Sequence, residues 1–155
     1  MRDGHLAMTG YRRHALTAAL LFSLIAASTP AQALACGVTP QSVPFGAYDT
    51  LAPGPADGVG MISVACDAET AFTVSVGTGA GSYDAREMHN GAEVLSYNLY
   101  TDASRVVVWG DGISGGSTVS ASGTSLDLPI YGRIPARQSV EAGSYSDLLV
   151  VTVTF

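Results

Sequence analysis

The sequence predicts an all-β protein, an antiparallel sandwich of short strands. Apolar and polar residues alternate with a period of two in several stretches, as in half-buried strands. The chain has 18 glycines, and Gly- and Ser-rich turn segments recur about every ten residues. After the amino-terminal segment, no stretch shows a sustained helical period. These observations together favour strands and tight turns over helices.

Residues 1–35 are expected to be a secretory signal peptide. Arg12 and Arg13 precede an apolar run over residues 15–27, and residues 31–35 have the small-residue A-x-A form of a cleavage site. The apolar run is too short for a bilayer-spanning helix. The arginine pair leaves a twin-arginine signal open as a weaker match.

The mature chain, residues 36–155, is expected to be one acidic, exported domain. Of 13 acidic residues only Asp3 precedes it, and of 7 basic residues three precede it, which leaves 12 against 4, a charge of about −8. The chain has no lysine. Such a surface repels phosphate groups, so nucleic acid is not expected as a partner. The acidic Asp3 within the basic region leaves Met8 open as the start of translation.

The two cysteines, Cys36 and Cys66, both lie in the exported part. An even number of cysteines in an oxidising compartment predicts one disulfide. Closing a loop of about 30 residues stabilises a fold by roughly 3 to 4 kcal/mol on the chain-entropy account. The stretch Ala33-Leu34-Ala35-Cys36 leaves an alternative open, in which Cys36 carries a lipid and Cys66 is unpaired.

The expected strands follow in order from the mature amino terminus. Pro129 cannot donate a ladder hydrogen bond, so its strand should be at an edge or bulged. The first strand carries Val38, Val43 and Phe45; strands 62–66 and 72–76 form a hairpin around the polar turn 67–70; strands 95–99, 106–109 and 126–130 follow, and the segment 121–125 is a connection.

The last expected strand ends the sequence. Leu149, Val151, Val153 and Phe155 fall on one face, and the residues between them fall on the other. Because an open apolar edge invites pairing with another chain, the strand raises the question of what pairs with it.

No catalytic, metal or cofactor site is expected. His89 is the one histidine of the mature chain and has no accompanying nucleophile motif; it is interpreted as a solvated histidine in a polar turn. One histidine and two paired cysteines do not make a zinc set, and the aspartates have no EF-hand spacing.

Several polar and aromatic residues are interpreted as structural. Tyr145, two residues before Asp147, resembles a tyrosine corner. Trp109 is expected to be a buried anchor at a strand end, although an exposed ligand contact is the alternative. Arg86 and Arg133 are expected to form ion pairs with the many carboxylates, with anion binding as the alternative.

An ordered set of motifs spans nearly the whole mature chain and resembles the spore coat protein U domain family. The motifs are Phe45-Gly46-x-Tyr48-Asp49, Ile62-x-Val64-x-Cys66, Arg86-x-Met88, Leu95-Ser96-Tyr97-Asn98-Leu99-Tyr100-Thr101-Asp102, Val108-Trp109-Gly110-Asp111-Gly112, Tyr131-Gly132-Arg133-Ile134-Pro135 and Gly143-x-Tyr145-x-Asp147.

The resemblance implies an incomplete immunoglobulin-like antiparallel β-sandwich that lacks its last strand and is completed by a donor strand. It also implies a non-enzymatic subunit of an archaic chaperone-usher pilus or a spore-coat-like surface layer, with a role in adhesion and biofilm formation. The implied partners are a periplasmic pilus chaperone, an outer-membrane usher and neighbouring pilin subunits. The implied location is the surface of a Gram-negative bacterium, reached through the periplasm.

On this interpretation, an acceptor groove lies between two apolar strands. Leu149, Val151, Val153 and Phe155 are expected on one wall, and Val38, Val43 and Phe45 on the other. Because the predicted mature terminus leaves almost no residues ahead of Cys36, the chain is expected to accept a strand without giving one, as a tip or terminator subunit would. The alternative is a self-contained secreted binding module, for example for glycan.

Overall fold

The structure, a computed structural model, describes residues 34–155, which contain strands and connecting segments and no helix. The predicted signal peptide lies outside these residues except for its last two. In the described part of the chain, no helix has the length and apolar character needed to cross a membrane. The strands are β1 (Cys36–Pro40), β2 (Ala56–Val76), β3 (Ala80–Gly81), β4 (Arg86–Asn90), β5 (Glu93–Tyr100), β6 (Val119–Ile134) and β7 (Val151–Thr154).

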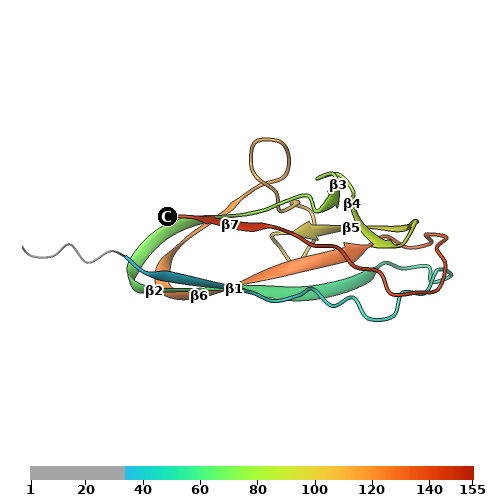
Figure 1. Cartoon of the computed structure of the whole chain (residues 1–155), viewed down its shortest axis with the longest axis horizontal. Helices are drawn as coiled ribbons and strands as arrows, with labels where there is room; N and C mark the ends of the chain where they lie inside the picture. Colours follow the sequence, from blue (N-terminus) through green and yellow to red (C-terminus); the bar gives the residue numbers. More distant parts are fainter. Residues whose placement is uncertain (1–33) are drawn as a thin grey trace, which may run out of the picture. The chain divides into compact units, whose positions relative to one another are not determined.

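All pairings between these strands are antiparallel, in the order β1-β2-β6-β5-β4-β3, with β7 also paired to β2. The antiparallel all-β fold predicted from the sequence is therefore confirmed. The long strands β2 and β6 pair along most of their length and form a bent ribbon (Figure 1). The bend brings the second half of β2, with β7, above the first half, with β1.

The predicted hairpin within residues 62–76 is wrong. The segment is one continuous strand, and β6 pairs with it on both sides of a register shift between Ala65 and Thr70. The polar residues of the expected turn lie at this irregularity, where the ribbon bends. A short polar run interrupts the alternation in the same way for a bulge as for a turn, and the long-range pairing with β6 decides between them.

Three other expected elements differ. The first strand was expected to carry Val43 and Phe45, but β1 ends at Pro40 and both residues lie in the segment after it. The segment 121–125 was expected as a connection, but it lies inside β6 because it pairs with β2. The segment 106–109 makes isolated bridges only, between Val108 and Tyr100 and between Trp109 and Ser117. At Pro129, β6 pairs with β2, whereas β5 pairs only with residues 131–133. At Pro129, β6 therefore has a paired strand, β2, on one side only, which suits a residue that has no N–H to donate.

The edges of the sheet determine where another strand could be added. β2 pairs with β1 through residues 62–66 and with β7 through residues 73–76, while β6 follows its other side. β1 and β7 therefore lie on the same side of the ribbon, one along each half. The opening between the two layers lies on this side.

The core lies between the layers. Its most buried apolar side chains alternate along β2 and are joined by others from β5, β6 and the segment before β6: Ile62, Val64, Phe72, Val74, Val76, Leu95, Tyr97, Leu99, Trp109, Ile130 and Ile134. Burying one such aliphatic side chain stabilises the fold by about 1.5 to 3 kcal/mol. The core thus depends on β2 contributing one face of its length to both layers.

Candidate functional site

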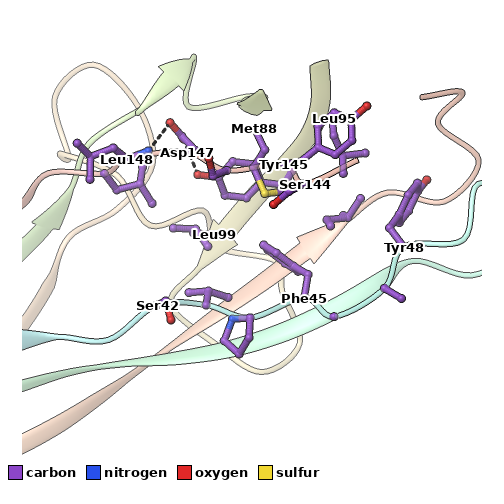
Figure 2. A pocket seen from close by; sticks show the side chains of 18 of the residues that line it. Ser42, Phe45, Tyr48, Met88, Leu95, Leu99, Ser144, Tyr145, Asp147 and Leu148 are labelled. Carbon is purple, nitrogen blue, oxygen red and sulfur yellow. Dashed lines mark hydrogen bonds between the residues drawn. The ribbon is translucent and has the colours of Figure 1, made fainter. Parts of the chain in front are cut away.

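An apolar groove opens between the segment that follows β1 and the segment that precedes β7. Its volume is about 1070 Å³, and Figure 2 shows side chains from both segments pointing into it. The floor consists mainly of core residues: Val76, Met88, Leu95, Tyr97, Leu99, Ile130 and Ile134. We call residues 40–50 the first wall and residues 140–151 the second wall.

The first wall is held mainly by packing. Val43 and Phe45 point inward and are half-buried. They lie over a trough of glycines, where an added Cβ would come 2.7 Å from Val43 at Gly60 and 2.6 Å from Phe45 at Gly132. Only a residue without a side chain leaves room for this close approach.

Backbone hydrogen bonds hold the first wall at its start. Gln41 N donates to the carbonyl of Met61 at 2.7 Å. Within the described residues, no backbone bond then links residues 42–49 to a neighbouring strand. At its far end the hydroxyl of Tyr48 donates to the Pro135 carbonyl and accepts from Gln138 N, both at 2.8 Å.

The second wall is held by backbone hydrogen bonds on one side. Ser146 exchanges both of its backbone bonds with His89 of β4, at 2.9 and 3.2 Å. Gly77 N donates to the Val150 carbonyl at 2.8 Å. Burial alternates along the wall, and Tyr145, Asp147, Leu149 and Val151 face inward.

His89, which pairs with Ser146, lies in the strand β4. This corrects the expectation that it lies in a turn.

The other edge of the second wall is open. In an extended strand, successive residues direct their N–H and C=O groups to opposite sides. Because Ser146 and Val150 point toward β4 and β2, the backbone groups of Tyr145, Asp147 and Leu149 point away from those strands. Within the described residues, none of these three makes a backbone hydrogen bond with another strand.

Asp147 ties the second wall to the body of the protein. One carboxylate oxygen accepts from Ala80 N at 3.1 Å and from Leu148 N at 2.8 Å, and the other accepts from the Tyr97 hydroxyl at 2.7 Å (Figure 2). Tyr145 donates its hydroxyl to the Glu141 carbonyl at 2.9 Å, which is the contact of a tyrosine corner.

Four of the seven residues expected in the groove line it, namely Val43, Phe45, Leu149 and Val151. The other three lie outside. Val38 is on β1 opposite Val64, before the chain reaches the groove. Val153 pairs with Val74, past the open end.

Phe155 is 54% exposed, and its ring lies 6.1 Å from that of Phe72. The floor residues Val76, Leu95, Tyr97, Leu99 and Ile130 lie in strands that the pattern predicted, but the pattern did not assign them to the groove. The trough glycines had no signal in the strand alternation. The spacing Gly58-x-Gly60 inside an otherwise apolar strand was the one available hint.

Arg86 is fully buried, and the predicted ion pair is wrong for it. Its guanidinium donates to the carbonyls of Val76, Gly77 and Trp109 and to the side chain of Asn98. Burial lowers the pKa of Arg86 from its usual value. The side chain thus satisfies backbone carbonyls that the strand pattern leaves without partners.

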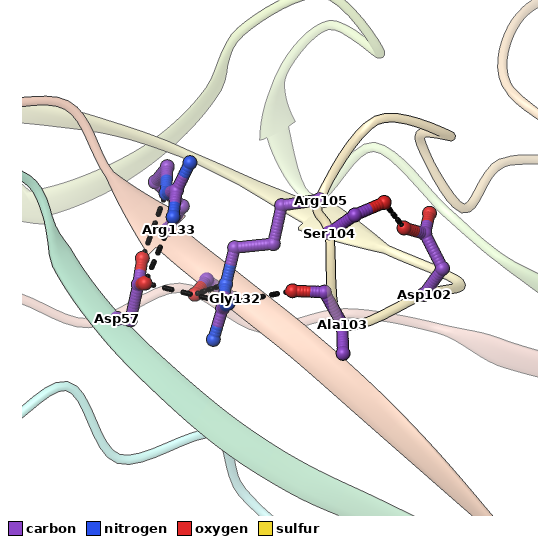
Figure 3. Close-up of polar contacts among 7 residues, drawn as sticks. All are labelled: Asp57, Asp102, Ala103, Ser104, Arg105, Gly132 and Arg133. Atoms are coloured by element: carbon purple, nitrogen blue, oxygen red, sulfur yellow. Dashed lines mark hydrogen bonds and ion pairs between the residues drawn. The ribbon is translucent and has the colours of Figure 1, made fainter.

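Arg133 does form an ion pair, with Asp57, through bonds of 2.7 and 2.9 Å. Arg105 lies 3.3 Å from the same carboxylate (Figure 3). The hydrogen bond from Arg133 lowers the pKa of Asp57.

Trp109 is 1% exposed and donates its indole N–H to the Val74 carbonyl. Its ring is therefore not available as a surface contact for a ligand.

The disulfide predicted between Cys36 and Cys66 is present and joins β1 to β2. The described chain has no free cysteine. The bond fixes the start of β1 beside the bend of the ribbon, so the first wall begins from a defined position.

The fold is all-β, with an open backbone edge on the second wall and an apolar groove beside it. Residues 21–152 match the model of the spore coat protein U domain. A relative, Protein U of Myxococcus xanthus, is 35% identical over 125 residues, which cover 72% of this chain and 70% of the relative. The chain belongs to the spore coat protein U domain family.

A similar solved structure is the chaperone–tip adhesion subunit pre-assembly complex CsuC–CsuE from the archaic chaperone-usher Csu pili of Acinetobacter baumannii. The TM-score is 0.57 at 21% identity. The match covers 79% of this chain and 40% of the matched chain. At this identity the likeness concerns the fold.

Proposed function

We propose that the protein is a structural subunit of a surface fibre assembled by a chaperone and an usher, and that its groove accepts a strand from another chain. The observation that carries the proposal is the coincidence of an apolar groove with an open backbone edge on the second wall. An added strand would satisfy that edge through main-chain hydrogen bonds and fill the groove with alternate side chains.

The energy of such an addition is large. Four or five apolar side chains at about 1.5 to 3 kcal/mol each contribute roughly 6 to 15 kcal/mol, which is comparable to the stability of a whole domain. The partners that follow are a periplasmic chaperone that lends a strand, an outer-membrane usher, and a neighbouring subunit that replaces the chaperone's strand. The final location is then the cell surface, with adhesion as the role of the fibre.

A position at the tip or terminus of the fibre follows if the signal is cleaved before Cys36, because few residues then remain to donate. Fibres rebuilt from purified subunits test this position. The protein is expected at ends only, and its presence at internal positions would refute the tip role.

The strand-acceptor function is tested by fusing an alternating Val-Thr segment of about ten residues to the carboxyl terminus through a flexible linker. The fusion is expected to be a monomer whose unfolding free energy exceeds that of the unfused chain by several kcal/mol. The matched control carries aspartate at the inward-facing positions of the same segment and should gain nothing. Equal stability of the two fusions would overturn the proposal.

A further inference from the structure

Tyr97 of β5 is in contact with both walls of the groove. Its ring packs edge-on against Phe45 of the first wall, with ring centres 5.8 Å apart and planes at 70°. Its hydroxyl donates to Asp147 of the second wall at 2.7 Å. Edge-to-face aromatic pairs and hydrogen bonds to a carboxylate are both directional contacts.

The side chain of Tyr97 has little freedom to adapt. It is 4% exposed, and burial followed by the bond to Asp147 raises its pKa above the usual value, so the hydroxyl keeps its proton and acts as a donor. Asp147 is fixed in turn by the backbone N–H of Ala80. The separation of the walls at this level therefore depends on one rigid side chain.

The rest of the groove has few such links. Within the described residues, no backbone hydrogen bond joins the first wall to the second. Tyr48 links the first wall to Pro135 and Gln138 at one end, before the second wall begins. At the other end of the groove, the apolar side chains of Leu149 and Val151 make no hydrogen bond or aromatic contact of the kind that Tyr97 makes.

We propose that Tyr97 is a positioning residue that holds the two walls at the separation an incoming strand requires, before that strand arrives. This inference rests on the proposed strand-acceptor function. A strand that enters a preorganised groove orders fewer groups on binding, and so binds more tightly. The role is distinct from folding stability, because a residue needed only for folding does not change the affinity of the folded protein.

The test compares Tyr97→Phe with Tyr131→Phe. Each loses one hydroxyl, but Tyr131 lies on β6 and is not among the residues that line the groove. The probe is a fluorescein-labelled peptide of about ten residues that alternates valine and threonine. Affinity is measured by anisotropy on the monomeric fraction, and the melting temperature is recorded in parallel.

Tyr97→Phe is expected to raise the Kd about tenfold, the effect of one hydrogen bond to a charged group, and Tyr131→Phe to change it less than about twofold. In a cycle with Asp147→Ala, which removes the acceptor, the double variant should bind about as weakly as Asp147→Ala alone. An unchanged Kd for Tyr97→Phe, whatever its melting temperature, overturns the role of Tyr97 but leaves the strand-acceptor function in place. Failure of the wild-type chain to bind the peptide overturns the inference and the strand-acceptor function together.

Discussion

The two walls of the groove are built differently. The second wall, residues 140–151, has backbone hydrogen bonds to β4 and β2 on one side and leaves its other side open. The first wall, residues 40–50, is bonded at its start and then lies on a trough of glycines. One wall thus offers fixed hydrogen-bonding groups, whereas the other offers apolar side chains on a backbone with few fixed contacts.

This difference indicates a division of roles. A strand that adds to the second wall finds its register set by N–H and C=O groups in fixed positions. The first wall instead offers apolar side chains that pack closely over the glycines, and Tyr97 sets its distance from the second wall. Changes in the second wall should therefore affect stability and register together, and changes in the first wall should affect packing.

The largest effect is expected from Asp147→Ala in the second wall. The substitution removes the acceptor for two backbone N–H groups and for the buried Tyr97 hydroxyl. Leaving the Tyr97 hydroxyl and the Ala80 N–H without their partner in a partly buried site is expected to cost about 3 kcal/mol in unfolding free energy, measured by urea denaturation. The control is Asp127→Ala, which loses one exposed bond to Ser63 and should cost less than about 1 kcal/mol. Equal losses would contradict the importance given to the second wall.

A smaller effect is expected from Gly60→Ala under the first wall. The new Cβ would lie 2.7 Å from Val43 and 2.8 Å from the Ser42 carbonyl oxygen, so the wall must move outward. Overpacking of this kind costs about 2 kcal/mol, and proteolysis within residues 42–49 should become faster.

At Gly37, the nearest atom to an added Cβ is 3.9 Å away. Gly37→Ala is therefore the matched control and should leave both stability and proteolysis unchanged. Slow proteolysis of Gly60→Ala would mean that the first wall does not depend on the glycine trough.

The smallest effect is expected from pH, at the ion pair outside both walls. The pKa of Asp57 is lowered in the folded protein, mainly by the hydrogen bond from Arg133. Its stabilisation is therefore complete above the unfolded pKa of about 4, and is lost as the pH falls through the lower folded pKa. Because the pair is partly exposed, the loss is small.

Arg133→Met should flatten this acid limb of the stability curve, while peptide affinity at neutral pH stays unchanged. Thermal melts between pH 2 and pH 7 measure the limb, roughly spanning the titration of a carboxyl group. If the variant loses as much stability in acid as the wild type, the acid dependence comes from other carboxylates.

The fold class could be predicted from the sequence because alternation is a local signal. The alternation of residues 149–153 predicted a strand with one inward face, and the structure has β7 there with that face half-buried. The bend of β2 could not be predicted in the same way. A polar interruption such as residues 67–70 is compatible with a turn or a bulge, and only the distant partner β6 distinguishes them.

The groove could be predicted only in part for a similar reason. The pattern marked Leu149, Val151, Val43 and Phe45 as apolar residues of expected strands, and the family resemblance suggested a groove between them. The same reasoning included Val38, Val153 and Phe155, which do not line it. Tyr97 is one of two aromatic residues in its strand. Its importance arises from contacts with residues 52 and 50 positions away in the chain. Likewise, nothing in the sequence around Arg86 shows whether its guanidinium bonds to backbone carbonyls or to carboxylates.

The central claim is that the open edge of the second wall is unpaired until another strand arrives. Amide hydrogen exchange of residues 145–149, measured in the unfused chain and in the Val-Thr fusion, tests it most directly. The Ser146 amide, bonded to His89, should be protected in both proteins. The Asp147 and Leu149 amides should gain protection only in the fusion. Asp147 and Leu149 amides that are equally protected in both proteins would contradict the account.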